Sequence, residues 1–252
     1  MLPFIKRLRG RAITASGPPG SRAYAIGDVH GRLDLLDALL ASIEEDSRSR
    51  RAAKTFIIFL GDLVDRGPDS RGVVDRLLNY RPDFARLVYL MGNHEEFLLN
   101  VIDGDMDLVG NWLTYGGEEC AASYGISQGW LLNAAAGSIC QELGKRVPAG
   151  HTAFLRSFGD SFRFGEYLFV HAGIRPGVAL EDQRPEDLRW IREEFLNDRT
   201  DHGVIVVHGH TIVAAPEERR NRIGIDTGAY RSGVLTAVAV QGAERWYLNA
   251  AD

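Results

Sequence analysis

Short apolar runs alternate with segments of helical hydrophobic spacing in the first hundred residues. The apolar runs at residues 22–26, 55–60 and 87–91 predict three buried strands. Apolar residues recur at helical spacing between the first two runs, namely Leu33, Leu35, Leu36, Leu39, Leu40 and Ile43. We expect residues 44–54 to form a polar connector. This alternation favours a βαβαβ unit with a parallel sheet.

A second predicted helix lies between the second and third strands. Ser70 is a suitable N-cap for it, and its apolar face is formed by Val73, Val74, Leu77 and Leu78. Residues 96–160 predict a mostly helical segment, interpreted as a cap beside the sheet.

The second half of the chain has a β pattern. Residues 161–164 and 167–170 predict a hairpin. Further strands are expected at 204–207 and 222–225 and near 233–240 and 244–248. The chain is therefore predicted to be an α/β protein with one domain over residues 23–252, preceded by a flexible basic tail over residues 1–22.

Composition and charge narrow the class of protein. The 252 residues are 45% hydrophobic and 25% charged, typical of a globular domain. Net charge is −5, while residues 1–22 carry five basic residues and no acid, so the body carries about −10. No nucleic-acid partner is expected, and no apolar run is long enough for a membrane span. The two cysteines predict reduced thiols in a cytoplasmic protein.

Polar glycine-flanked turns follow the predicted strands. Asp28 and His30 follow the first strand, Asp62 and Asp65 the second, and Asn93 the third. The carboxyl ends of parallel strands share one sheet edge, where ligands bind in open α/β sheets. The sequence therefore predicts one polar site there.

The residue types in these turns indicate a metal site. Imidazole, carboxylate and amide ligands without thiolate argue against structural zinc. Six candidates are too many for one catalytic ion with open positions, but they suit two ions that share a carboxylate. The candidate metal ligands are Asp28, His30, Asp62, Asn93, His171 and His210.

The neighbouring residues indicate phosphate chemistry. Arg66 directly follows the aspartate pair, and a guanidinium matches phosphate oxygens. His94, beside Asn93, is a candidate general acid, and Asp65 can orient its ring. His208 is expected to be structural, and Arg192 has no role on spacing alone.

The ordered motifs resemble those of a known family. Gly27–Gly31, Gly61–Gly67 and Gly92–Glu95 are similar to the three signature motifs of the phosphoprotein phosphatases, a family of calcineurin-like metallophosphoesterases. His171–Gly173 and His208–Thr211 resemble its later motifs in the form common among bacterial serine/threonine phosphatases.

The resemblance implies a four-layer α-β-β-α sandwich with mixed sheets. It implies that Asp28 and His30 bind the first metal, that Asp62 bridges, and that the second is bound by Asn93, His171 and His210. It further implies that Arg192 is a second phosphate arginine and that Tyr230 approaches the substrate. The ions implied are manganese, with iron and zinc as alternatives.

The expected function is hydrolysis of phosphoserine and phosphothreonine in protein or peptide substrates by direct attack of metal-bound hydroxide, with phosphotyrosine as a further candidate. Hydrolysis of diadenosine tetraphosphate at the same site is the main alternative. A thiol mechanism is disfavoured: Cys140 and Arg146 have the Cys-x5-Arg spacing, but the stretch holds one glycine. A non-catalytic metal-binding module is also disfavoured, because no ligand is missing.

Overall fold

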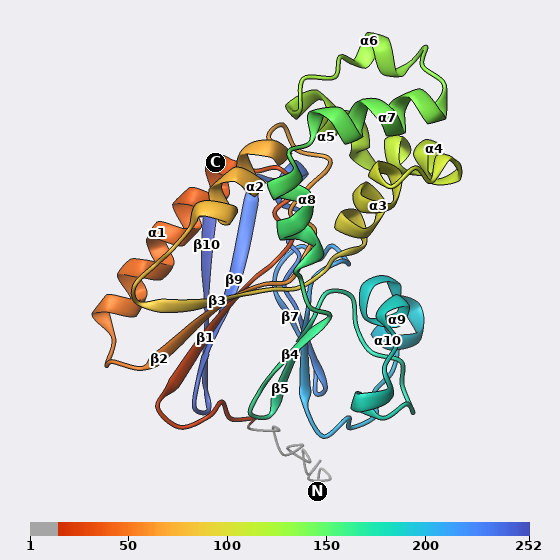
Figure 1. The fold of residues 1–252 in the computed structure, drawn as a ribbon. Helices are drawn as coiled ribbons and strands as arrows, with labels where there is room; N and C mark the ends of the chain where they lie inside the picture. Colours follow the sequence, from red (N-terminus) through yellow and green to blue (C-terminus); the bar gives the residue numbers. More distant parts are fainter. Residues whose placement is uncertain (1–14) are drawn as a thin grey trace, which may run out of the picture.

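The computed structural model describes residues 15–252, and it contains two five-stranded mixed sheets packed face to face (Figure 1). In the first sheet the order is β10-β9-β1-β2-β3. Its strands are β1 (Ser21–Ile26), β2 (Lys54–Phe59), β3 (Ala85–Tyr89), β9 (Val234–Gln241) and β10 (Glu244–Ala251). In the second sheet the order is β4-β5-β6-β8-β7. Its strands are β4 (Ser161–Phe164), β5 (Tyr167–Val170), β6 (Ile205–His208), β7 (Glu217–Glu218) and β8 (Arg222–Gly224).

The predicted βαβαβ unit is confirmed. Strands β1, β2 and β3 pair in parallel, and they are joined by helices α1 (Leu33–Ser49) and α2 (Ser70–Asn79). The expected polar connector over residues 44–54 is wrong in its first half, because α1 continues to Ser49. Ion pairs at helical spacing support this last part of α1, between Arg48 and Glu44 and between Arg50 and Asp46.

The predicted N-cap of α2 is also wrong by one residue. Asp69 is the cap, and its carboxylate accepts a hydrogen bond from the Gly72 amide at 2.7 Å. Ser70 is the first helical residue, and its hydroxyl accepts from the Asp65 amide at 2.9 Å. Ser70 therefore supports the polar turn rather than the helix end.

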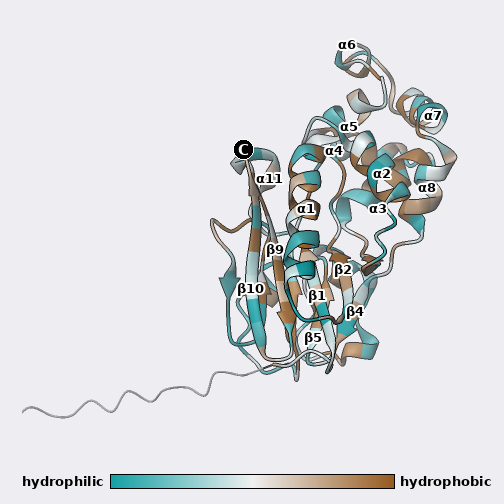
Figure 2. Cartoon of the chain, turned by 90° about the vertical axis from the view of Figure 1, so that its left-hand side faces the viewer, coloured by the Kyte–Doolittle hydropathy of each residue, from teal (hydrophilic) through white to brown (hydrophobic). Residues whose placement is uncertain are grey.

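Three apolar cores separate four layers, which confirms the predicted α-β-β-α sandwich. Alternate residues of β1 point to opposite faces: Tyr24 and Ile26 pack beneath α1, whereas Ala23 and Ala25 pack between the sheets. A third core lies between the second sheet and the helices α9 (Pro185–Trp190) and α10 (Glu193–Leu196). Figure 2 shows α1 lying across the first sheet, whose strands carry many hydrophobic residues.

The helical segment beyond β3 forms a cap at one end of the sheets (Figure 1). Its helices are α3 (Asn93–Ile102), α4 (Val109–Trp112), α5 (Glu118–Ser123), α6 (Gln128–Leu131), α7 (Ala136–Arg146) and α8 (Ala149–Arg156). A π-helical turn, Leu113–Gly117, joins α4 to α5. The cap begins earlier than the expected residue 96, because α3 starts at Asn93 and so includes two predicted site residues. Near the C-terminus, α11 (Ala229–Ser232) precedes β9.

The structure differs from the predicted N-terminal tail over residues 15–22. Ala15 is buried, and its carbonyl accepts a hydrogen bond from Tyr167. Arg22 lies fully buried in β1, with its guanidinium bonded to Gln241, Ser47 and Arg51. The other basic residues of that prediction, between 6 and 11, lie outside the described residues. Among the described helices, none is long and apolar enough to cross a membrane.

Candidate metal centre and active site

The polar turns after the strands adopt backbone conformations that side chains rarely tolerate. Over residues 15–252, five non-glycine residues have φ between 44° and 70°, namely His30, Asp62, Asp65, Arg66 and His210. All five were predicted as site residues. Left-handed conformations cost free energy in non-glycine residues and persist where the surrounding structure enforces them, which is common at functional sites.

Glu95 enforces the conformation of the turn after β2. Its carboxylate is fully buried and accepts hydrogen bonds from four backbone amides. The distances are 2.8 Å from Asp62, 2.7 Å from Leu63, 3.3 Å from Val64 and 3.0 Å from Gly92. Burial and the nearby Asp62 raise the pKa of Glu95 to about 7. Sequence reasoning gave Glu95 no role, although it occupies the capping-box position of α3.

Asp62 lies at the centre of the predicted ligands. Its Oδ2 is 3.6 Å from Nε2 of His30, and its Oδ1 is 3.4 Å from Nε2 of His171. Within the described residues, two groups have ligand atoms close enough to hold an ion, and Asp62 belongs to both. One group adds His30 and His94, and the other adds His171 and His210. This position suits the shared carboxylate of a dimetal centre.

Hydrogen bonds at Nδ1 hold the rings of His30 and His171 in place. Nδ1 of His30 lies 2.7 Å from the Val64 carbonyl oxygen, and Nδ1 of His171 lies 2.8 Å from that of Leu60. A carbonyl can only accept, so each Nδ1 carries the proton and each Nε2 presents its lone pair to the site. This arrangement is the usual support of metal-binding histidines.

Asn93 joins the second group. Its Oδ1 lies 3.0 Å from Nε2 of His171 and 2.9 Å from Nδ1 of His210. Nε2 of His171 lies 3.2 Å from Nδ1 of His210. Three predicted ligands from distant parts of the chain therefore converge.

Asp28 closes the other side of the site. Its two oxygens accept hydrogen bonds from the His210 amide at 3.2 and 3.0 Å. Burial, Asp226 and Asp62 together raise the pKa of Asp28 well above its ordinary value. Asp226 is itself buried, and its Oδ2 has no hydrogen-bond partner among the described residues. The sequence analysis gave Asp226 no role in the site.

Buried carboxylates and imidazole nitrogens lie close together in this site, and such a donor set can bind divalent cations. Three carboxylates, Asp28, Asp62 and Asp226, lie in one buried site, where their like charges repel. Two imidazole nitrogens, Nε2 of His171 and Nδ1 of His210, lie 3.2 Å apart, and both are within 3.0 Å of Oδ1 of Asn93. A donor set of carboxylate, amide and imidazole is suited to manganese, iron or zinc. All six predicted ligands lie in this site.

His94 and Asp65 form a buried pair beside the metal ligands. Nδ1 of His94 lies 2.7 Å from Oδ2 of Asp65. The other Asp65 oxygen accepts from the Trp112 indole at 3.1 Å. Burial opposes protonation of His94, but Asp62 and Asp65 outweigh it and raise the pKa of His94. The cap thus contributes Trp112, which sequence reasoning did not assign to the site.

Arg66 and Tyr230 border the site on its open side. Nη1 of Arg66 lies 3.0 Å from Nε2 of His30, and its guanidinium carbon lies 5.1 Å from the centre of the Tyr230 ring. The Tyr230 and His30 rings meet edge to face at 5.4 Å. The Arg66 amide donates to the carbonyl of Gly116 in the π-helical turn at 2.9 Å. The cap therefore fixes the backbone of Arg66.

Arg192 precedes α10 and is exposed. Burial, then the charge of His171 and that of Arg192, lower the pKa of His210 to about 2. The charge of Arg192 therefore acts on His210, one of the predicted ligands.

Two other candidates lie outside the site. His208 is buried with Nδ1 at 3.0 Å from the Gly209 carbonyl, and burial lowers its pKa to about 4. Cys140 lies inside α7, which extends to Arg146. This stretch is helical rather than a phosphate-binding loop, so the structure argues against a thiol mechanism.

The family model for calcineurin-like phosphoesterases matches residues 21–232. The chain belongs to this family. The predicted membership is confirmed, and with it a phosphoesterase activity that depends on bound metal. The family uses a dimetal site, and the two groups of close ligand atoms around Asp62 are candidates for it in this chain.

Curated relatives of this calcineurin-like phosphoesterase have two kinds of activity. Serine/threonine-protein phosphatase 1 of Salmonella typhimurium is 25% identical over 226 residues, 86% of this chain and 91% of the relative. The asymmetrical bis(5'-nucleosyl)-tetraphosphatase PrpE of Anoxybacillus flavithermus is 26% identical, with 84% and 88% covered. The symmetrical bis(5'-nucleosyl)-tetraphosphatase of Legionella pneumophila (strain Corby) is 27% identical, with 88% and 95% covered.

Solved structures share the fold. A structure provisionally described as a diadenosine tetraphosphatase has a TM-score of 0.63 at 21% identity, with 94% of this chain and 98% of that chain covered. The cold-active protein-tyrosine phosphatase of a Shewanella species has a TM-score of 0.56 at 18% identity, with 93% and 84% covered.

Proposed function

We propose that this phosphoesterase is a protein phosphatase that releases phosphate from phosphoserine and phosphothreonine, and that it also accepts phosphotyrosine. The observation that carries the proposal is the His94–Asp65 pair at 2.7 Å beside the metal ligands, with Arg66 across the site. That constellation suits a phosphate ester whose leaving oxygen needs a proton. Manganese as the ion and a cytoplasmic location stay predictions.

Each group has a distinct role in the proposed reaction. Asp28, His30 and Asp62 would hold one ion, and Asp62, Asn93, His171 and His210 would hold the other. Bound divalent ions supply Lewis acidity and a water of lowered pKa. Arg66 and Arg192 hold the phosphoryl oxygens. His94 then donates its Nε2 proton to the leaving oxygen, while Asp65 keeps Nδ1 protonated and stabilises the imidazolium.

An aromatic rim lies beside Arg66. We define it as Phe97, Tyr115 and Trp190. The Phe97 ring meets Tyr115 at 6.4 Å and Trp190 at 5.0 Å. Tyr115 is 54% exposed and Trp190 38% exposed. Nε of Arg66 donates to the Tyr115 carbonyl at 3.4 Å, so the rim borders the proposed phosphate position.

The rim also favours a second candidate function. An exposed aromatic surface can stack on a nucleobase as well as on a tyrosine ring. Hydrolysis of dinucleoside polyphosphates therefore remains the alternative, as the activities of the curated relatives also suggest. Both candidates use the same metal centre.

Substrate rates measured in parallel test the proposal. Metal-stripped protein with manganese restored would be given a phosphothreonine peptide, a phosphotyrosine peptide and diadenosine tetraphosphate. We expect kcat/KM to be at least tenfold higher for the peptides than for the dinucleotide. Efficient cleavage of the dinucleotide alone would overturn the protein-phosphatase proposal and leave the metal centre in place.

The rim predicts a substrate-selective effect of Tyr115→Ala. Loss of one stacking ring costs about 1–3 kcal/mol, so we expect KM for the phosphotyrosine peptide to rise about fivefold or more. The KM for the phosphothreonine peptide should change less than twofold, because a threonine side chain offers no ring. Steady-state kinetics on the two peptides provides the measurement.

Trp130→Ala is the matched control for this prediction. Trp130 is 39% exposed and lies in α6, at the far end of the cap (Figure 1). The Trp130→Ala substitution should leave the KM values for both peptides unchanged. An equal rise for both peptides with Tyr115→Ala would indicate damage to Arg66 instead of lost stacking.

A further inference from the structure

A cavity lies away from the metal centre, between α10 and the β7–β8 hairpin. Its volume is about 610 Å³. The lining residues are Glu193, Leu196, Asn197, Asp198, Arg199, Arg219, Arg220, Asn221 and Arg222. The set contains none of the metal-site residues. Arg222 begins β8, whereas Asp226 of the metal site follows its other end.

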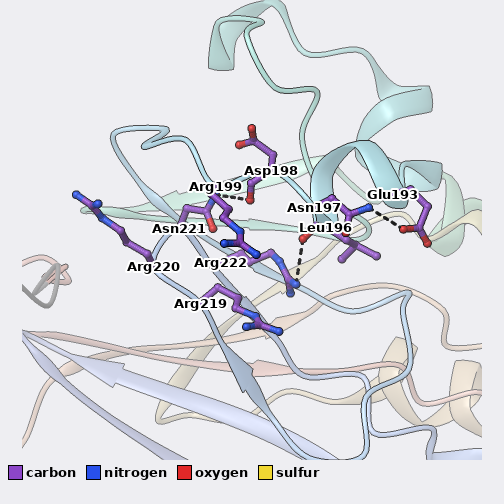
Figure 3. Close-up of a pocket in the computed structure, with 9 residues that line it drawn as sticks. All are labelled: Glu193, Leu196, Asn197, Asp198, Arg199, Arg219, Arg220, Asn221 and Arg222. Carbon is purple, nitrogen blue, oxygen red and sulfur yellow. Dashed lines mark hydrogen bonds between the residues drawn. The ribbon is translucent and has the colours of Figure 1, made fainter. Parts of the chain in front are cut away.

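Three arginines direct their guanidinium groups into this cavity. Figure 3 shows Arg199, Arg219 and Arg222 gathered on one side, with Arg220 turned away. Arg199 comes from the loop after α10, and the other two come from the hairpin. The proposed phosphoesterase reaction uses none of these three arginines, so their convergence needs a separate explanation.

Arg222 has unused hydrogen-bonding capacity. It is only 5% exposed, and its Nε has no partner among the described residues. Its Nη1 pairs with Glu217 at 2.7 Å, and its Nη2 donates to the Leu196 carbonyl at 3.3 Å. A buried donor without an acceptor is costly, so the partners within the described residues do not saturate the Arg222 guanidinium.

The neighbouring acids only partly balance the arginines. Glu217 pairs with both Arg219 and Arg222. Asp198 is bonded to Thr200 and lies near His202, and Glu193 accepts from Asn197. Within residues 15–252, no carboxylate pairs with Arg199. The cavity therefore keeps positive charge available for a ligand.

A buried amide fixes the geometry of this cavity. Asn221 is 3% exposed, and its Nδ2 donates to the carbonyls of Asp198 and Thr200 at 3.2 and 3.0 Å. The loop that carries Arg199 is thereby tied to the hairpin that carries Arg219 and Arg222. Such an arrangement reduces the conformational entropy lost on binding.

We propose that this cavity is a second anion site, separate from the metal centre, that binds a small molecule with a diphosphate group. Guanidinium forks match phosphate oxygens. The volume lies within the range of small-molecule pockets and exceeds the needs of one phosphate. Two ligand sources share this chemistry, namely inorganic pyrophosphate and a nucleoside diphosphate.

Calorimetric titration of the metal-stripped full chain tests the proposal. The probes are inorganic pyrophosphate and α,β-methylene-ADP, a nucleotide analogue that resists hydrolysis. We expect one binding site, weakened about tenfold or more by Arg199→Ala and by Arg219→Ala. Equal affinities would indicate recognition of the diphosphate alone, and tighter binding of the nucleotide would extend the site to the nucleoside.

Two variants locate the binding. Arg220→Ala removes an equal charge from the same hairpin. Arg220 also lines the cavity, but its guanidinium points away from those of Arg199, Arg219 and Arg222 (Figure 3), so its loss should leave the affinity within twofold. Arg66→Ala would weaken any binding of the probe at the metal centre, so it should leave the affinity for the cavity unchanged. Absence of binding, equal weakening by Arg199→Ala and Arg220→Ala, or loss only with Arg66→Ala would each overturn the proposal.

Discussion

His94→Gln is expected to lower kcat for a phosphothreonine peptide by about 10²- to 10⁴-fold, the usual contribution of a general acid. The physical reason is the loss of the proton that Nε2 delivers to a poor leaving group. The effect should be much smaller for p-nitrophenyl phosphate, whose phenolate leaves without protonation. Steady-state rates on both substrates, with bound manganese quantified in each variant, provide the measurement.

His151→Gln is a matched control for this prediction. His151 is also buried, but it bonds to Tyr124 and Asp75, away from the metal centre. It should leave the ratio of the two rates unchanged. If His94→Gln slows both substrates equally while manganese content falls, His94 acts in holding the metal, and the assignment as general acid is wrong.

Glu95→Ala is expected to lower the free energy of unfolding by about 3–5 kcal/mol. It leaves four buried backbone amides without their acceptor, and each unpaired buried group costs about 1–3 kcal/mol before relaxation. For a chain of this size the melting temperature should fall by about 6–20 °C. The melting temperature should be measured on metal-stripped protein, because bound ions would add their own stabilisation.

Glu119→Ala provides the control for that experiment. Glu119 is an exposed glutamate of α5, and its loss should shift the melting temperature by less than about 2 °C. Glu95→Gln keeps one acceptor oxygen and should lie between the two. A melting temperature for Glu95→Ala equal to that of Glu119→Ala would show that other contacts hold the turn after β2.

The sequence pattern was sufficient for most strands of both halves of the fold, including the hairpin of β4 and β5. Apolar runs and helical spacing each depend on a few neighbouring residues, so β1, α1 and β2 could be predicted before any tertiary contact was known. The end of α1 was missed because residues 44–49 have no apolar face and are held by ion pairs along the helix. The burial of Ala15, Gly17 and Arg22 was missed because linker-like composition does not reveal packing against β5 and β9.

The same contrast holds for the site. Asp28, Asp62 and Asn93 could be predicted together because parallel strands place successive turns at one edge. Glu95, Asp226 and Trp112 could not, because each acts by satisfying or crowding groups far away in the sequence. Which acid holds a backbone turn, and which arginines share a cavity, depends on side chains brought together from separate elements. The sequence by itself therefore determined which ligand types and catalytic groups meet at the sheet edge. Only the tertiary structure decided which buried groups hold that edge in place and which arginines gather in a separate cavity.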